Sequence, residues 1–273
     1  MKRIARLFAL TISTAALLFS SLSYAQSDEQ HIQEILDRTG FNKLLDYVPQ
    51  LSQNILKQSA GTLDPEVTSA LNGAFQRAFT SRAVRRSVLA TVRGHFDADK
   101  AEQYLTQLNS PLAQQMAALE RLPNQAENQA AFQTYASQLQ SSPAAAPRQA
   151  LIERLDTANN TTGFSVELQT ALFKAVFAAV DPILDDDMKL SEGELDKMVT
   201  EVRESLHKDT QFRTHASYLF AFKDLTDAEL NSYVELCESS QHRWAIQLLG
   251  NAMVSALNQS GERAALFMAQ SAE

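Results

Sequence analysis

The sequence predicts an all-α protein, a multi-helix array built from two diverged helical units. Apolar residues recur every three or four positions, as along residues 44–55 and 67–79, which is the spacing of one helix face. The 273 residues include only eight glycines and seven prolines, so few positions favour turns. No long run of alternating β-branched residues indicates a strand.

The first 25 residues have the pattern of a secretory signal peptide. A basic start at Lys2 and Arg3 leads into an apolar stretch from Leu7 to Phe19, and small residues follow at Ser23 and Ala25. The alternative is a retained anchor helix, but the apolar stretch is short for a span of about 20 residues. We expect cleavage after Ala25, no later transmembrane segment, and a soluble protein in the periplasm or secreted from the cell.

Local signals then set the helix boundaries in chain order. Stops are expected near Gly40 and Gly61. Starts are expected at Asp64-Pro65-Glu66 and at two capping boxes, Ser191 with Glu194 and Thr226 with Glu229. The segment SSPAAAP, residues 141–147, is the strongest break in the chain. We therefore divide the mature chain into a unit of residues 26–140, a Ser/Pro/Ala linker of residues 141–147, and a unit of residues 148–273.

Two segments repeat the same pattern, which is why the units are predicted to be related. Phe96–Glu120 aligns with Leu225–Leu249 without gaps, and Ile32–Thr39 aligns with Leu151–Ala158. Each long segment is predicted to be a helix–break–helix corner, with a buried tyrosine in its first helix and a serine capping its second. These residues are Tyr104 and Ser110 in one corner, and Tyr233 and Ser239 in the other. The alternative is that any two leucine-rich amphipathic helices look alike.

The corner residues also resemble a known family. LTDAELNSYVELCESSQHRW and SPLAQQMAALE are similar to the pattern T-x-x-E-L-x-x-(Y/F)-x-x-F-x-x-S-P-x-G in exported bacterial proteins that contain a small all-helical domain of unknown function. This chain departs from the pattern at Ala113 and His242, which replace its glycine, at Ser240, which replaces its proline, and at Lys100. The resemblance implies an exported helical protein and no active site.

The charge of the chain disfavours some partners. The full sequence carries a net charge of −8, and the predicted signal peptide contains three basic residues and no acidic one, so the mature chain is more acidic still. Proteins that bind nucleic acid gain most of their non-specific affinity from phosphate neutralisation. We therefore expect no nucleic acid partner.

No catalytic or metal motif is evident. The carboxylate cluster at Asp181–Asp196 lacks the spacing of a calcium loop, and none of the five histidines has a ligand partner at zinc-site spacing. The single cysteine, Cys237, shares a predicted helix face with Leu230, Tyr233 and Val234, which indicates a buried thiol. An intermolecular disulfide and a nucleophilic thiol are the alternatives. We expect no cofactor, no metal and no identifiable catalytic residue.

Two clusters remain as binding candidates. The first is a basic patch on one predicted helix, which could dock an anionic partner or envelope component, or pair with the more acidic second half of the chain: Arg82, Arg85, Arg86 and Arg93. The second is aromatic, in the segment from Phe212 to Phe222. Phe220 and Phe222 cannot share one helix face, so one of them could line a groove, unless the helix is buried on several sides.

These observations favour a non-catalytic binding or interaction protein of the cell envelope, whose partner is a protein or an envelope component. The alternative is a hydrolase with an active site scattered along the sequence. A deep pocket that gathers a histidine with a carboxylate or a serine would favour the hydrolase.

Overall fold

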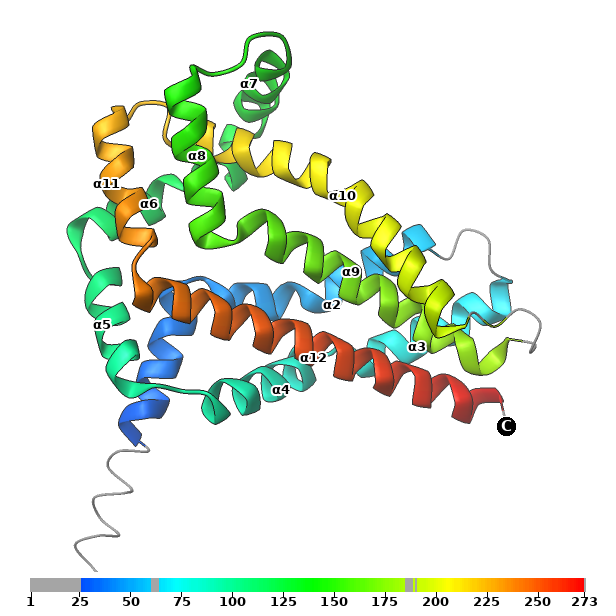
Figure 1. The fold of residues 1–273 in the computed structure, drawn as a ribbon. Coiled ribbons are helices and arrows are strands. Elements are labelled where there is room, and N and C mark those ends of the chain that lie inside the picture. Colours follow the sequence, from blue (N-terminus) through cyan, green and yellow to red (C-terminus); the bar gives the residue numbers. More distant parts are fainter. Residues whose placement is uncertain (1–25, 60–63, 185–188, 190, 273) are drawn as a thin grey trace, which may run out of the picture.

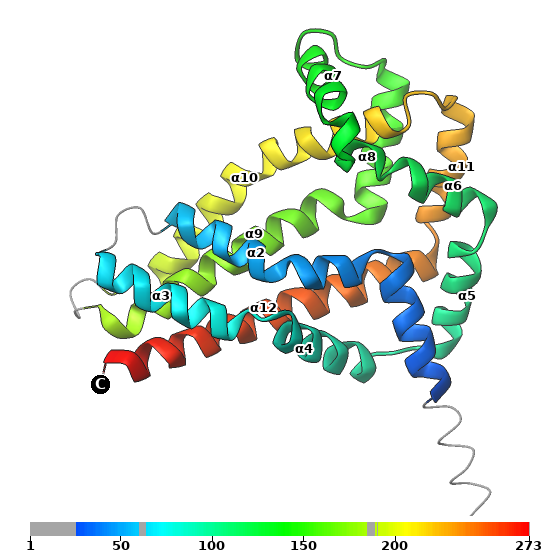
Figure 2. The ribbon, with the colours of Figure 1, turned by 180° about the vertical axis from the view of Figure 1, so that it is seen from behind.

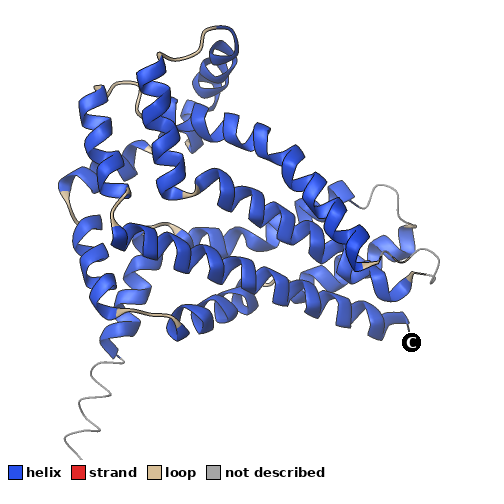
Figure 3. Cartoon of the chain, viewed as in Figure 1, coloured by secondary structure: helices blue, strands red, loops and turns tan. Residues whose placement is uncertain are grey.

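The structure, a computed structural model, describes residues 26–59, 64–184, 189 and 191–272. All secondary structure in these residues is helical, which confirms the predicted fold class (Figure 3). The predicted signal peptide, residues 1–25, and the predicted stop at Gly61 lie outside the described residues.

The described helices follow one another with short connections (Figure 1). After a first helix of residues 26–38, the N-terminal half contains α2 (Phe41–Ser59), α3 (Pro65–Ala78), α4 (Ser81–Gly94), α5 (Ala98–Leu108), α6 (Pro111–Leu119), the 3-10 turns η2 (Leu122–Asn124) and η3 (Ala126–Asn128), and α7 (Gln129–Ser141). The C-terminal half contains α8 (Ala146–Asn159), α9 (Thr161–Val180), the turn η4 (Asp181–Ile183), α10 (Glu192–Ala221), α11 (Asp227–Cys237) and α12 (Ser240–Ala272). The predicted break at residues 141–147 lies where α7 gives way to α8.

Helices α9 and α12 form the centre of the larger core, with α2, α3 and α4 packed around them (Figures 1 and 2). A Cβ atom added at Gly261 of α12 would lie 2.8 Å from the Cβ of Ala175, so glycine permits the close approach of α12 to α9. A smaller core lies between α6, α8, α10 and α11, around Phe222 and Leu230. Both cores contain residues from both halves of the chain, so the linker does not separate two independent hydrophobic cores.

Segment Thr161–Ile183, which comprises α9 and η4, meets the length and composition of a membrane span, with a mean hydropathy of 1.3. The sequence predicts no membrane-spanning segment after residue 25. Half of its most apolar window is buried inside the protein. Its buried residues, such as Leu172 and Val176, belong to the larger core, and α9 packs against α12 and α10. Its apolar surface therefore has protein partners, as expected of a central helix in a helical array.

The two halves share an order of elements. A tight turn with positive φ ends the first helix of each half, at Gly40 with φ 74° and at Asn160 with φ 49°. The second helix of each half, α2 or α9, is followed by a helical stretch of 30 residues. In the C-terminal half this stretch is the continuous helix α10, and in the N-terminal half it is divided into α3 and α4. The break falls at Thr80, whose side chain caps α4.

Both predicted corners are present. Tyr104 and Tyr233 are buried, at 1% and 7% exposure. The Ser110 hydroxyl accepts the amide hydrogen of Ala113 at 3.2 Å, and the Ser239 hydroxyl accepts that of His242 at 3.3 Å. The capping boxes predicted at Ser191 and Thr226 also form. Local capping chemistry thus specified both corners, whereas the duplication itself stays a prediction.

Candidate functional site

The two corners face each other across a cavity of about 450 Å³, which we call the corner pocket. The side chain of Gln107 on α5 joins them, because it donates to the carbonyl of Leu236 on α11 and accepts a hydrogen bond of 3.0 Å from the Ser239 hydroxyl. The chemically significant residues of the pocket come from five helices and the turn after α6: Tyr104, Glu120, Asn159, Tyr218, Tyr233 and His242.

Glu120 is the central ionisable group of the corner pocket. It follows the last residue of α6, and its Oε1 accepts a hydrogen bond of 3.0 Å from the Tyr233 hydroxyl. Burial raises the pKa of Glu120 to about 7, and the hydrogen bond from Tyr233 and the charge of Arg121 offset only part of this rise. The carboxyl group is therefore partly protonated near neutral pH.

A second hydrogen-bonded chain forms another wall of the pocket. Asn159 donates its amide hydrogen to the Tyr218 hydroxyl at 3.0 Å, and the Thr161 hydroxyl lies 2.6 Å from the same oxygen. The Nε2 of His242 lies 2.8 Å from Asn159 Oδ1. Since the amide oxygen only accepts, Nε2 carries the hydrogen. Burial lowers the pKa of His242 to about 4, so the ring is neutral at pH 7 and its Nδ1 is a hydrogen-bond acceptor.

Three polar atoms of the pocket keep unused hydrogen-bonding capacity. The Tyr104 hydroxyl, the Nδ1 of His242 and the second carboxyl oxygen of Glu120 make no hydrogen bond to the described part of the chain. The Tyr104 ring packs edge-on against His242, with 5.6 Å between ring centroids, so the positions of these two side chains are fixed by contact. A bound molecule could therefore be held by groups that the fold has already placed.

Cys237 lies beside the same pocket as a free, buried thiol, which confirms the predicted burial. Burial and the nearby Glu120 carboxylate raise the pKa of the Cys237 thiol to about 12. The thiolate is the nucleophilic form of cysteine, so this residue is chemically inert at neutral pH.

A second cavity of about 340 Å³ lies between the α7–α8 connection, α8 and α10. His215 lines it, and its Nε2 lies 3.1 Å from Oδ2 of the buried Asp156. Asp156 also accepts the Thr162 amide hydrogen at 2.8 Å and the Thr162 hydroxyl at 2.6 Å, close to the start of α9. Burial opposes ionisation of Asp156, but these hydrogen bonds outweigh it and lower its pKa. Within the described residues, no serine, threonine or cysteine side chain bonds to His215.

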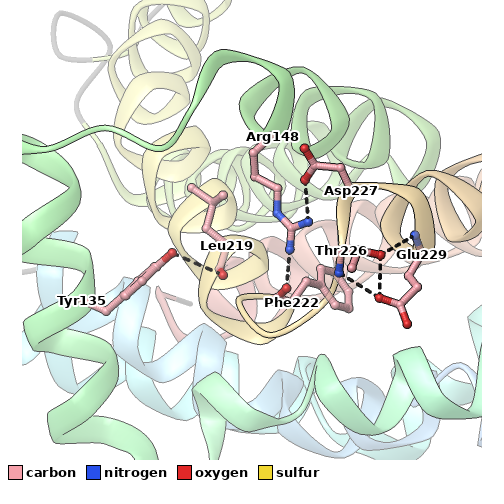
Figure 4. Close-up of polar contacts among 7 residues, drawn as sticks. All are labelled: Tyr135, Arg148, Leu219, Phe222, Thr226, Asp227 and Glu229. Atoms are coloured by element: carbon pink, nitrogen blue, oxygen red, sulfur yellow. Dashed lines mark hydrogen bonds and ion pairs between the residues drawn. The ribbon is translucent and has the colours of Figure 1, made fainter.

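The end of α10, which carries Tyr218, is held in place by neighbouring helices (Figure 4). Arg148 of α8 donates to the carbonyl of Phe222 and forms an ion pair with Asp227 at 2.9 Å. Tyr135 of α7 donates to the Leu219 carbonyl at 3.4 Å. The Arg148 guanidinium thus satisfies a carbonyl where α10 ends and joins it to the start of α11.

The aromatic segment does not supply the predicted groove residue. Phe220 and Phe222 are both buried, at 4% and 0% exposure, because helices pack on several sides of the end of α10. Phe212 is the exposed aromatic residue of this segment, and like His215 it lines the second cavity.

The predicted basic patch lies on α4, and the structure divides it: Arg82, Arg85, Arg86 and Arg93. Arg85 pairs with Asp46 of α2 at 2.9 Å, and Arg93 pairs with Glu29 of the first helix at 2.8 Å. Both partners belong to the N-terminal half and help to attach α4 to its neighbours. Arg82 and Arg86 are exposed. Docking of an anionic partner on this patch stays a prediction.

Sequence reasoning found the corner tyrosines as core residues but missed Glu120 and Tyr218 as site residues. One pattern could have indicated Glu120. It lies four residues after Met116 and seven after Ala113, both buried, so α6 aligns a carboxylate with its apolar stripe. Ala113 and His242, which face each other in the alignment of the two corners, both line the corner pocket.

Comparisons with models of known protein families, with curated proteins and with solved structures found no match to this chain. In the described residues, no group of three or more histidine, cysteine, aspartate or glutamate side chains could hold a metal ion.

Proposed function

We propose that this chain is an exported, non-catalytic binding protein of the cell envelope, and that the corner pocket holds its small polar ligand. One observation carries the proposal. The pocket presents the Tyr104 hydroxyl, the His242 imidazole and the Glu120 carboxyl with hydrogen-bonding capacity that the described part of the chain does not use. Binding sites for small molecules are typically concave and contain a few convergent polar groups in an otherwise apolar lining.

The pocket does gather a histidine with a carboxylate, the feature expected of the alternative hydrolase. Its chemistry nevertheless favours binding. Cys237 is a neutral thiol, and His242 uses Nε2 to donate to Asn159 rather than to activate a nucleophile. The His215–Asp156 pair faces a cavity whose lining offers no serine or cysteine. A hydrolase would need a nucleophile or a positioned water at one of these sites, and binding requires neither.

The position of the pocket also supports the proposed duplication. Gln107 and Leu236, which contact each other, are 129 positions apart, the same offset that aligns the corners. Four further pairs with this offset line the pocket: Tyr104 with Tyr233, Leu108 with Cys237, Ala113 with His242, and Ala117 with Ile246. In a two-fold arrangement each copy presents the same surface to the other, so equivalent residues meet around the axis. We infer that the pocket arose at the junction of two related units.

Export is the second part of the proposal and is supported by the pattern of residues 1–25 and by the resemblance to exported helical proteins. A protein outside the cytoplasm is exposed to the pH and solutes of its surroundings. A ligand pocket with a carboxyl group that titrates near pH 7 would respond to both.

Native mass spectrometry of the protein purified from its own exported fraction tests the proposal. We expect a non-covalent adduct on the wild-type chain, and no adduct on Ala117→Phe, whose ring would fill the pocket. Ala118→Phe is the matched control, because Ala118 is the exposed neighbour on the same helix and does not line the pocket. An adduct that persists in Ala117→Phe, or a wild-type chain without one, contradicts the proposal.

A further inference from the structure

We propose that the ligand of the corner pocket is a small primary ammonium compound, and that Glu120 is its counter-charge. This inference rests on the proposed function and names the chemical class of the ligand.

The first argument is that Glu120 lacks a cationic partner. Its only hydrogen bond among the described residues comes from the neutral Tyr233 hydroxyl. Arg121 acts on it only through charge at a distance, and His242 is neutral at pH 7. A carboxylate removed from water is costly unless a cation pairs with it, and the described residues supply no such cation to Glu120. A ligand that brings a positive charge would supply one.

The second argument is a match of hydrogen-bonding groups. A primary ammonium carries three N–H donors and no acceptor. The unused atoms of the pocket are a carboxyl oxygen of Glu120, the hydroxyl oxygen of Tyr104 and the Nδ1 of His242, and all three can accept. The rings of Tyr104 and His242 around them provide a partly apolar, aromatic surface of the kind that organic cations favour.

The charges at the rim limit what the rest of the ligand can be. Lys43 and Arg121 line the pocket and are exposed, and neither forms an ion pair in the described part of the chain. One exposed carboxylate, Asp37, also lines the pocket and accepts a hydrogen bond from Asn42, so an excess of positive charge remains at the rim. A second ammonium group at the rim would be repelled, which disfavours diamines. A neutral or anionic far end is favoured, so an ω-amino acid or a similar zwitterion fits the distribution of charge.

The test uses two probes that differ in one group, 5-aminopentanoate and 5-hydroxypentanoate. We expect isothermal titration calorimetry of the ligand-stripped mature protein at pH 8 to show binding of the amine, with the hydroxyl analogue at least tenfold weaker. Glu120→Gln should weaken amine binding at least tenfold. Glu127→Gln is the matched control, because Glu127 is exposed and does not line the pocket. Tyr104→Phe, which removes one acceptor and keeps the ring, should weaken binding several-fold.

Each outcome decides one of the two proposals. If both probes bind equally, or if Glu120→Gln binds the amine as well as the wild type, the ammonium assignment is wrong. The pocket function still stands if Ala117→Phe abolishes that binding. If neither probe binds, the ammonium assignment is also overturned, and the adduct in native mass spectrometry then decides the proposed function by itself.

Discussion

Replacing Glu120 by glutamine should stabilise the protein, by an amount that depends on pH. The pKa of Glu120 rises from an ordinary 4.5 to about 7 on folding, because the carboxyl group is buried without a cation. A shift of one pKa unit corresponds to about 1.4 kcal/mol, so the full shift corresponds to roughly 3 kcal/mol. Since the residue as a whole is only half-buried, solvent screening reduces this value, and we expect about 2 kcal/mol.

The sign follows from the direction of the shift. A folded state with a raised carboxyl pKa binds its proton more tightly than the unfolded chain does. The contribution of Glu120 to stability is therefore fully present below pH 4.5 and is lost as the pH rises from 4.5 to about 7. Glutamine has no such titration and keeps an oxygen for the Tyr233 hydroxyl. The variant should match the wild type near pH 4 and exceed it by about 2 kcal/mol at pH 8.

Urea unfolding of both mature, ligand-stripped proteins between pH 4 and pH 8 measures this difference. His242 titrates in the opposite sense: its pKa falls from 6.5 to about 4, so stability is lost as the pH falls through that window. Because His242 is present in both proteins, its effect cancels in the difference. Glu127→Gln should show no such pH-dependent gain. A wild type that is as stable as Glu120→Gln at pH 8 would refute the assignment of Glu120 as a buried, unpaired carboxyl.

Three further predictions follow from the corners and the N-terminus. Tyr104→Ala and Tyr233→Ala should each lower the free energy of unfolding by about 3–5 kcal/mol, and by similar amounts if the corners are equivalent. Urea unfolding measures both losses, and losses that differ several-fold would argue against equivalence. Cys237 should react slowly with thiol reagents until the protein unfolds, because it is 1% exposed, and fast native labelling would contradict its packing. Intact mass of the protein from its own host should correspond to a chain that begins at Gln26, whereas the uncleaved chain in a membrane fraction would contradict export.

The sequence allowed prediction of the features that depend on near neighbours. The caps at Ser110, Ser191 and Thr226 each need residues within three positions, so the pattern is visible in one short segment. The burial of Cys237 followed from the spacing of a single helix face.

The pocket could not be predicted, because its residues come together only through packing. Tyr233 and Glu120 are 113 positions apart, and His242 and Asn159 are 83 apart. The ion-pair partners of the arginines on α4 could not be predicted either. Arg93 pairs with Glu29, 64 positions earlier, although the sequence suggested a partner in the acidic second half of the chain. Phe212 lines a cavity and Phe222 does not, since helices α7 and α8 pack on α10 and the ring of Phe222 packs against Tyr233 of α11, whereas Phe212 lies at a more exposed turn.

The central claim is that the corner pocket is a ligand site completed by a bound cation. A crystal structure of the mature protein, purified from its own host without a denaturing step, tests this most directly. The account predicts electron density larger than water between Tyr104, His242 and Glu120, with an atom of the bound molecule within about 3 Å of the Glu120 carboxyl, the usual distance of a charge-assisted hydrogen bond. Ordered water alone in the pocket, with a bound molecule elsewhere on the protein, would contradict it.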